Sequence, residues 1–125
     1  MNVLLVFIGG GLGALLRWGL GNIPFFRSQH LLTSTLLSNV IAAMLLGFSY
    51  RLLAHETSSQ QNALWLLIAT GFCGGLSTFS TFSLESFKMI QNQEWLNCSA
   101  YLLLNVGLSF LLLIFAYQIS EGWKG

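Results

Sequence analysis

Residues 63–87 read ALWLLIATGFCGGLSTFSTFSLESF, an apolar run of helical length with Gly71, Gly74 and Gly75 near its middle and hydroxyl side chains after them. No charged residue occurs in this run before Glu85. A membrane-spanning helix needs about 20 apolar residues, so the run is long enough to cross a bilayer. Glycines and hydroxyl residues at mid-depth weaken a helix, and the pattern therefore predicts a spanning helix that is broken at its centre.

Three further apolar runs flank this one, and charged residues mark their ends. A charge at the centre of a bilayer is costly, so it locates the end of a span. We expect four spans within a single membrane domain of residues 1–125, which predicts an all-α membrane protein. Their expected bounds are about 2–21, 31–53, 62–88 and 95–119, and the tryptophans Trp18, Trp65, Trp95 and Trp123 fit an aromatic belt near their ends.

The composition excludes most other classes of protein. Of the 125 residues, 54% are hydrophobic and 7% are charged, and the mean hydropathy is +0.70. Soluble domains carry about 25% charged residues, so an ordinary soluble enzyme, a disordered chain and a nucleic-acid binder are all excluded. Cys73 and Cys98 stand in apolar stretches without the spacing of a metal site, and we interpret them as small buried residues.

The positive charges are balanced across the membrane. With four spans both termini lie on one side, together with Arg51 and Lys124, whereas Arg27 and Lys88 lie on the other side. Orientation follows the bias of Lys and Arg, so a chain without bias is expected to insert both ways and to form an antiparallel homodimer of dual topology. The alternative is that another group, such as Arg17 at the edge of the first span, breaks the tie.

Polar side chains recur at helical spacing within the second and fourth spans. Asn39 follows Thr35 by four residues, and Tyr101, Asn105 and Ser109 are also spaced by four, so each set lines one face of a helix. One such stripe is as consistent with hydrogen bonds between helices as with a polar path. Two stripes in a chain of four spans favour the path.

Small residues in the first two spans predict close helix packing. Gly9 and Gly13 are four residues apart, as are Ala43 and Gly47, and this spacing lets two helices approach closely. Arg17, near the end of the first span, either reaches the headgroups or faces a wet cavity.

The third span continues after its glycines with aromatic and hydroxyl residues. Phe79 and Phe82 are three apart and share a helical face, and Thr78, Thr81 and Glu85 share a neighbouring one. Aromatic residues at this spacing ordinarily pack in a core. Ring edges are electropositive, however, so two phenyl edges beside hydroxyls could line a path for a small anion. An interrupted helix also exposes carbonyls that bind cations and N–H groups that bind anions.

At GFCGGLSTFSTFSLE (71–85) the chain resembles the Fluc (CrcB) family of bacterial fluoride channels. The segments GGGLGALLRW (9–18), TLLSNVIAAMLLG (35–47) and YLLLNVGLS (101–109) extend the resemblance to all four spans. It implies an ion channel and not an enzyme, built as a dual-topology antiparallel homodimer with two antiparallel pores. It also implies passive export of fluoride across the bacterial inner membrane, which protects the cell against fluoride toxicity.

The resemblance implies roles for individual pore residues. Phe79 and Phe82 match the family's pore phenylalanines, whose ring edges approach fluoride. Asn39 matches the second-span asparagine that projects into the pore. The other polar positions that it places along the pore are Ser80, Thr81, Tyr101 and Asn105.

A metal ion and two vestibule charges are also implied by the resemblance. Gly74 and Ser77 match positions whose backbone carbonyls bind a structural Na⁺ at the dimer interface. Many relatives have threonine where this chain has Ser77, a change to which a backbone ligand is indifferent. Arg17 and Glu85 match charges near the vestibules.

Three other classes of protein explain the sequence less well. A proton-coupled small multidrug transporter needs a carboxylate inside the membrane, but the acidic residues stand near span ends. An accessory subunit leaves the group of Phe79 to Phe82 unexplained, and an enzyme lacks a paired nucleophile. The residues that decide these points are Glu56, Glu85, Glu94 and Glu121 for the transporter and the distant loop histidines His30 and His55 for the enzyme.

Overall fold

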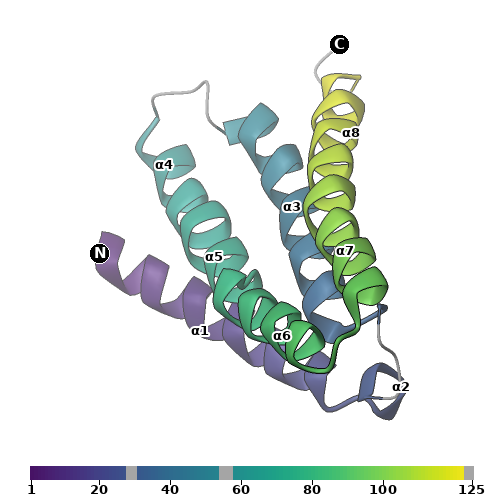
Figure 1. Cartoon of the computed structure of the whole chain (residues 1–125). Coiled ribbons are helices and arrows are strands. Elements are labelled where there is room, and N and C mark those ends of the chain that lie inside the picture. Colours follow the sequence, from purple (N-terminus) through teal and green to yellow (C-terminus); the bar gives the residue numbers. More distant parts are fainter. Residues whose placement is uncertain (28–30, 54–57, 123–125) are drawn as a thin grey trace.

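The computed structural model describes residues 1–27, 31–53 and 58–122, without the side chains of Arg27 and Glu121. Every regular element in these ranges is helical (Figure 1). The residues His30, His55, Glu56, Trp123 and Lys124, which entered the predictions above, lie outside the described part of the chain.

Four helical segments are long and apolar enough to cross a membrane, which confirms the expected all-helical protein with four spans. They are Asn2–Gly21, Ser34–Leu53, Ser59–Gln91 and Trp95–Ser120. The first is α1 (Asn2–Gly21) and the second is α3 (Ser34–Leu53), with the one-turn helix α2 (Pro24–Arg27) between them.

The third and fourth spans are each assembled from several helical elements. The third consists of α4 (Ser59–Trp65), the π-helix η1 (Leu66–Cys73), α5 (Gly74–Leu76) and α6 (Phe79–Gln91). The fourth consists of α7 (Trp95–Leu103), the π-helix η2 (Leu104–Leu108) and α8 (Ser109–Glu121).

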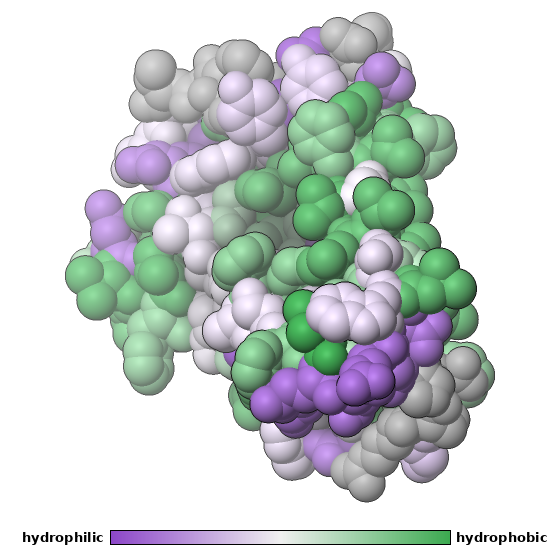
Figure 2. All heavy atoms as spheres, viewed as in Figure 1, coloured by the Kyte–Doolittle hydropathy of each residue, from purple (hydrophilic) through white to green (hydrophobic). Residues whose placement is uncertain are grey.

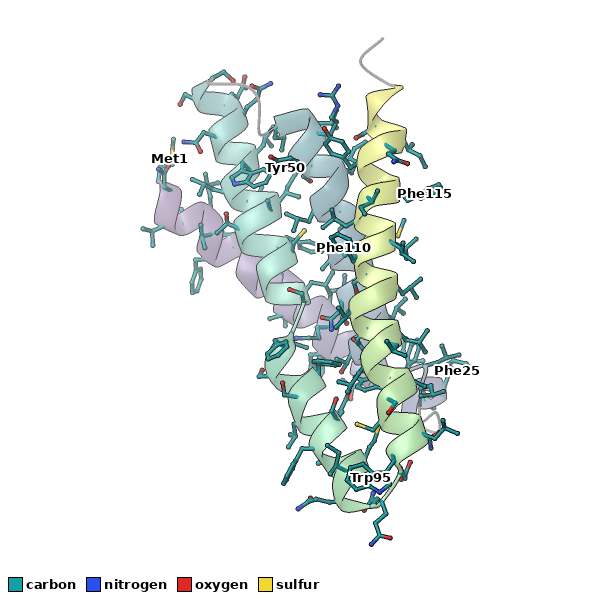
Figure 3. All side chains as sticks on the ribbon, turned by 45° about the horizontal axis from the view of Figure 1, so that its top comes forward. Met1, Phe25, Tyr50, Trp95, Phe110 and Phe115 are labelled. Carbon is teal, nitrogen blue, oxygen red and sulfur yellow. The ribbon has the colours of Figure 1, made fainter. Side chains whose placement is uncertain are left out.

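The spans form a bundle in which α1 packs obliquely against the third span, while α3 runs beside α8 (Figure 1). Apolar side chains cover the middle of the face seen in Figure 2, and polar side chains gather at its two ends. Trp95 lies at the end of the bundle where α6 turns into α7, far from Tyr50 at the other end (Figure 3). Large apolar side chains such as Phe7 and Leu103 are exposed, as the surface of a chain in lipid requires.

Glycines of α1 bring this helix into backbone contact with the third span. A Cβ atom at Gly9 would overlap the carbonyl oxygen of Leu67, and one at Gly13 would overlap that of Phe72. The predicted packing role of these two glycines is therefore confirmed. In the second span, a Cβ at Gly47 would overlap the carbonyl oxygen of Leu113, so this glycine packs α3 against α8.

The third-span glycines do not interrupt their helix. Gly71 and Gly75 are helical and face α1, where a Cβ at Gly75 would overlap the carbonyl oxygen of Gly10. These glycines are therefore used for close packing against α1, and the extended backbone comes after them, at Ser77 and Thr78.

Two extended residues, Ser77 and Thr78, separate α5 from α6. Ser77 has φ −72° and ψ 153°, and Thr78 has φ −152° and ψ 117°. The change in backbone direction is visible as the narrow stretch of ribbon between α5 and α6 in Figure 3. The Thr78 hydroxyl oxygen then accepts a hydrogen bond from the N–H of Thr81 at 3.2 Å, and this cap starts α6.

Candidate functional site

A groove of about 240 Å³ lies beside the start of α6 and is bounded by α3, η2 and the beginning of α8. Amides and hydroxyls meet two phenyl rings there, so the groove offers hydrogen-bond donors and apolar ring edges together. Phe79 is 78% exposed, so one of the two rings lies at the surface of the single chain. The lining residues are Asn39, Ser77, Thr78, Phe79, Phe82, Asn105, Val106 and Ser109.

Asn39 of α3 holds the extended part of the third span. Its Oδ1 atom accepts the backbone N–H of Thr78 at 2.8 Å, and its Nδ2 atom donates to Asn105 Oδ1 at 3.0 Å. In a continuous helix the N–H of Thr78 would donate to the carbonyl of Gly74. The side chain of Asn39 therefore takes the place of the Gly74 carbonyl as the acceptor for this N–H. It links the second, third and fourth spans at one point.

Three hydroxyl groups meet at the start of α6. Thr78 Oγ1 donates to Thr81 Oγ1 at 3.1 Å and lies 3.2 Å from Ser80 Oγ. Thr81 is half-buried and Ser80 is exposed. Among the described residues, no acceptor is found for the hydroxyl proton of Thr81. The start of a helix carries partial positive charge, so this cluster can bind an anion.

Phe79, Phe82 and Tyr101 form a row of three neighbouring aromatic rings, which we call the ladder. The centroids of Phe79 and Phe82 are 5.6 Å apart with planes inclined by 51°, and Phe82 and Tyr101 are 5.6 Å apart with planes inclined by 40°. Phe82 and Tyr101 are buried. Tilted rings turn their electropositive edges toward neighbouring groups, so the ladder leads from the exposed groove into the bundle.

The side chain of Glu85 lies at the inner end of this ladder. Its Oε2 atom accepts a hydrogen bond from the Tyr101 hydroxyl, and its Oε1 atom accepts one from Thr35 Oγ1 at 3.0 Å. Thr33 Oγ1 lies 3.3 Å from the Tyr101 hydroxyl. The carboxylate is thus bound between α3 and α7 and is only half exposed to its surroundings.

One groove-lining hydroxyl is left without a partner. Ser109 Oγ is buried and makes no hydrogen bond within the part of the chain that the structure describes. Burying a hydroxyl without a hydrogen-bond partner lowers the stability of the fold. Ser109 is therefore available to donate to a ligand that enters the groove.

A family model described as "CrcB-like protein, Camphor Resistance (CrcB)" matches residues 4–117 of this chain. The chain belongs to the CrcB family. It is 45% identical to the "Fluoride-specific ion channel FluC" of Pyrococcus abyssi over 122 residues, covering 92% of this chain and 95% of that relative. It is also 40% identical to "Fluoride-specific ion channel FluC 1" of Yersinia pseudotuberculosis over 123 residues, covering 98% of this chain and 95% of the relative.

The four apolar helices make this CrcB-family chain a multi-pass membrane protein. Most of the residues to which the resemblance gave a role are near the groove. Gly74, Arg17 and Glu85 are not among the residues that line it: Gly74 is exposed, and Arg17 is half-buried on α1. The lining includes Asn39, Ser77, Phe79, Phe82 and Asn105, while Ser80, Thr81 and Tyr101 contact lining residues.

Residues at and near this CrcB-family site that were not among the predicted site positions include Thr78 and Thr33. Thr78 caps α6 and contacts both Ser80 and Thr81. Threonine is a preferred cap residue, and this is the one local signal that marks Thr78 in the sequence. Thr33 contacts Tyr101, which is 68 residues away in the sequence. No local pattern marks Thr33, because it is followed directly by the equally good caps Ser34 and Thr35.

Proposed function

We propose that this protein is a fluoride channel that lets the ion cross the membrane passively. The observation that carries the proposal is the groove at the start of α6, which is lined by the amide of Asn39 and the hydroxyl of Thr78 together with the rings of Phe79 and Phe82. The similar proteins named above are fluoride-specific ion channels, which are not enzymes.

The groove has the chemistry that fluoride requires. The ion holds its water tightly, so a pore must replace much of that shell with hydrogen-bond donors. Free donors are the hydroxyls of Thr81 and Ser109, and Asn105 Nδ2 has a second N–H beyond the one that it gives to the Tyr101 carbonyl. Ring edges add weaker contacts that let the ion leave again. Asn39 also lines the groove, and Ser80 contacts the lining residue Thr78.

The channel is proposed to be an antiparallel homodimer of dual topology. Polar backbone and side chains cannot face lipid, and the groove opens on the surface of the single chain beside the exposed ring of Phe79. A second copy that covers the groove would remove this exposure, and the balanced Lys and Arg distribution supports insertion in both orientations. Two inverted subunits would create two antiparallel pores.

A structural Na⁺ at the dimer interface is part of the proposal, and the backbone of the third span fits it. A continuous helix would direct the N–H groups of Thr78 and Thr81 at the carbonyls of Gly74 and Ser77. Those N–H groups donate instead to Asn39 Oδ1 and Thr78 Oγ1. Both carbonyls are therefore without their helical donors, and carbonyl oxygens are suitable ligands for a hard cation. When bound, Na⁺ would add positive potential near the anion path.

The proposed location is the bacterial inner membrane, where the channel would export fluoride and protect the cell against its toxicity. Fluoride that enters as neutral HF ionises inside the cell and leaves through the pore. Arg17 and Glu85 are proposed to lie near the two vestibules, with Glu85 held by Tyr101 and Thr35.

The test is anion efflux from liposomes that contain the purified protein. A fluoride electrode records release while valinomycin clamps the K⁺ potential, and chloride release is measured in parallel. We expect rapid loss of fluoride, no loss of chloride and no release from protein-free liposomes. Liposomes that contain folded protein and still retain their fluoride would contradict the proposal. Proton-coupled drug exchange would then be assayed next.

A further inference from the structure

A chain of hydrogen bonds with one direction leads from the start of α3 to the carboxylate of Glu85. Thr33 immediately precedes α3 and accepts the backbone N–H of Leu36 on its Oγ1 atom at 3.1 Å, so it is the cap of this helix. The same Oγ1 atom lies 3.3 Å from the Tyr101 hydroxyl, which donates to Glu85 Oε2.

The direction of each bond follows from a count of protons. A tyrosine hydroxyl has one proton, and in this chain Tyr101 gives it to the carboxylate. The bond between Thr33 and Tyr101 must therefore be donated by Thr33. The oxygen of Thr33 remains free to accept the N–H of Leu36. Every donor points toward Glu85, so the positive end of α3 is connected to its negative charge.

The other carboxylate oxygen is held from the same helix. Thr35 Oγ1 donates to Glu85 Oε1 at 3.0 Å, and both Thr35 and Tyr101 are buried. A partly buried carboxylate needs such donors, because leaving it unpaired costs more than the bonds contribute. Thr33, Thr35 and Tyr101 thus form a clasp, defined by these three residues, that fixes Glu85 between α3 and α7.

The clasp changes the role of Tyr101. Its only proton is directed at Glu85, so it has none to donate to an anion. Its ring, however, is 5.6 Å from Phe82, which lines the groove. Tyr101 therefore connects the position of the carboxylate to that of a groove ring.

We propose that Thr33 is a positioning residue for anion passage, because it holds the Tyr101 hydroxyl on Glu85 and thereby fixes both the carboxylate and the Phe82 ring. This inference rests on the proposed fluoride channel. Without the Thr33 hydroxyl, the Tyr101 hydroxyl loses one of its two partners, so the carboxylate and the ring beside Phe82 are held less firmly. A negative charge displaced toward the anion path would repel the permeating ion.

The first test compares Thr33→Val, Thr33→Ser and the control Thr70→Val in the fluoride efflux assay. Valine keeps the shape of threonine without its hydroxyl, whereas serine keeps the hydroxyl, which serves both as the helix cap and as the donor to Tyr101. Thr70 is exposed on η1 and is not part of the groove. We expect Thr33→Val to slow efflux about tenfold, as for the loss of one hydrogen bond to a charged network, while the other two variants keep the wild-type rate.

A double-mutant cycle separates positioning from simple helix capping. In the Tyr101→Phe background the clasp has already lost its central hydroxyl, so adding Thr33→Val should slow efflux by less than about twofold. The thermal stability lost with the cap should be the same in both backgrounds. An equal slowing of efflux by Thr33→Val with and without the Tyr101 hydroxyl would overturn the inference.

Infrared spectroscopy supplies a readout that does not depend on transport. The carboxylate band of Glu85 is isolated as the difference between the wild-type spectrum and that of Glu85→Gln. Thr33→Val should shift this band, and Thr70→Val should not. Wild-type protein that does not release fluoride would overturn the proposed function together with this inference, whereas normal efflux or an unshifted band in Thr33→Val would overturn the inference alone.

Discussion

Asn39 Oδ1 accepts the backbone N–H of Thr78 at 2.8 Å, so a side chain of the second span completes the hydrogen bonding of the third span. The same amide donates to Asn105 on the fourth span at 3.0 Å. An extended backbone inside a membrane is tolerated only where its polar groups are satisfied by protein or water. Asn39 therefore supports the fold and the groove at once.

Replacing Asn39 should separate these two effects. Asn39→Leu leaves the N–H of Thr78 and the amide oxygen of Asn105 without partners, and we expect it to lower the free energy of unfolding by about 2 kcal/mol. Asn39→Asp keeps an acceptor for the N–H of Thr78 but places a negative charge beside the groove, so it should stop fluoride efflux. Denaturation in detergent and the liposome assay measure the two quantities. Wild-type stability of Asn39→Leu would contradict the assigned hydrogen bonds.

Replacing either groove phenylalanine by isoleucine should reduce fluoride efflux and leave the proposed dimer assembled. The two variants should differ in stability, because Phe82 is 6% exposed within the subunit and Phe79 is 78% exposed. We expect Phe82→Ile to cost about 1–2 kcal/mol through imperfect repacking of the core, whereas Phe79→Ile should leave the subunit fold unchanged. Size-exclusion chromatography and thermal denaturation check assembly and stability. Undiminished efflux in both variants would exclude the rings from the path.

The α1 glycines should tolerate no side chain where they meet the third span. Gly9→Ala and Gly13→Ala would each press a methyl group into a carbonyl of the third span, and we expect a loss of about 1–3 kcal/mol. Gly11→Ala is the matched control on the same helix, because nothing lies within 4 Å of a Cβ at that position. Equal thermal stability of Gly9→Ala and Gly11→Ala would show that the close approach of α1 to the third span at Gly9 does not contribute to stability.

The four-span architecture could be predicted from the sequence because a charge in lipid is so costly that nine charged residues almost suffice to mark the ends. The small-residue face of α1 was equally readable, since the spacing of Gly9 and Gly13 requires only a regular helix. The packing role of Gly71 and Gly75 could not be predicted from the sequence. A glycine that weakens a helix and a glycine that allows close packing have the same sequence pattern until the position of the neighbouring helix is known.

Other features depend on partners that are distant in the sequence. The π-helices η1 and η2 carry no distinctive composition, and η2 presents Asn105 to Asn39 through packing between spans. Glu85 was predicted as a vestibule charge, but its contacts with Tyr101 and Thr35 depend on how α6 packs between α3 and α7. Helical periodicity identifies residues on one face and does not identify which face will meet them.

Sodium should stabilise the proposed dimer through the backbone of the third span. The carbonyls of Gly74 and Ser77 lack their helical donors, because the N–H groups of Thr78 and Thr81 donate to Asn39 and to the Thr78 hydroxyl instead. Na⁺ that binds to these carbonyls would raise the melting temperature of the proposed dimer. We expect a higher melting temperature in NaCl than in KCl at equal ionic strength. Ser77→Ala should keep this difference, since the proposed ligand is the carbonyl and not the hydroxyl.

Gly74→Leu tests where that sodium site lies. A Cβ at Gly74 meets nothing within 4 Å inside the subunit, so the substitution should leave the subunit fold intact. At a dimer interface the same side chain would hold the two copies apart, and both the dimer and its dependence on Na⁺ should be lost. Gly11→Leu, at a second open position, is the control. If Gly74→Leu remained a dimer with the full effect of Na⁺, the cation would have to bind away from Gly74 and from the interface proposed around it.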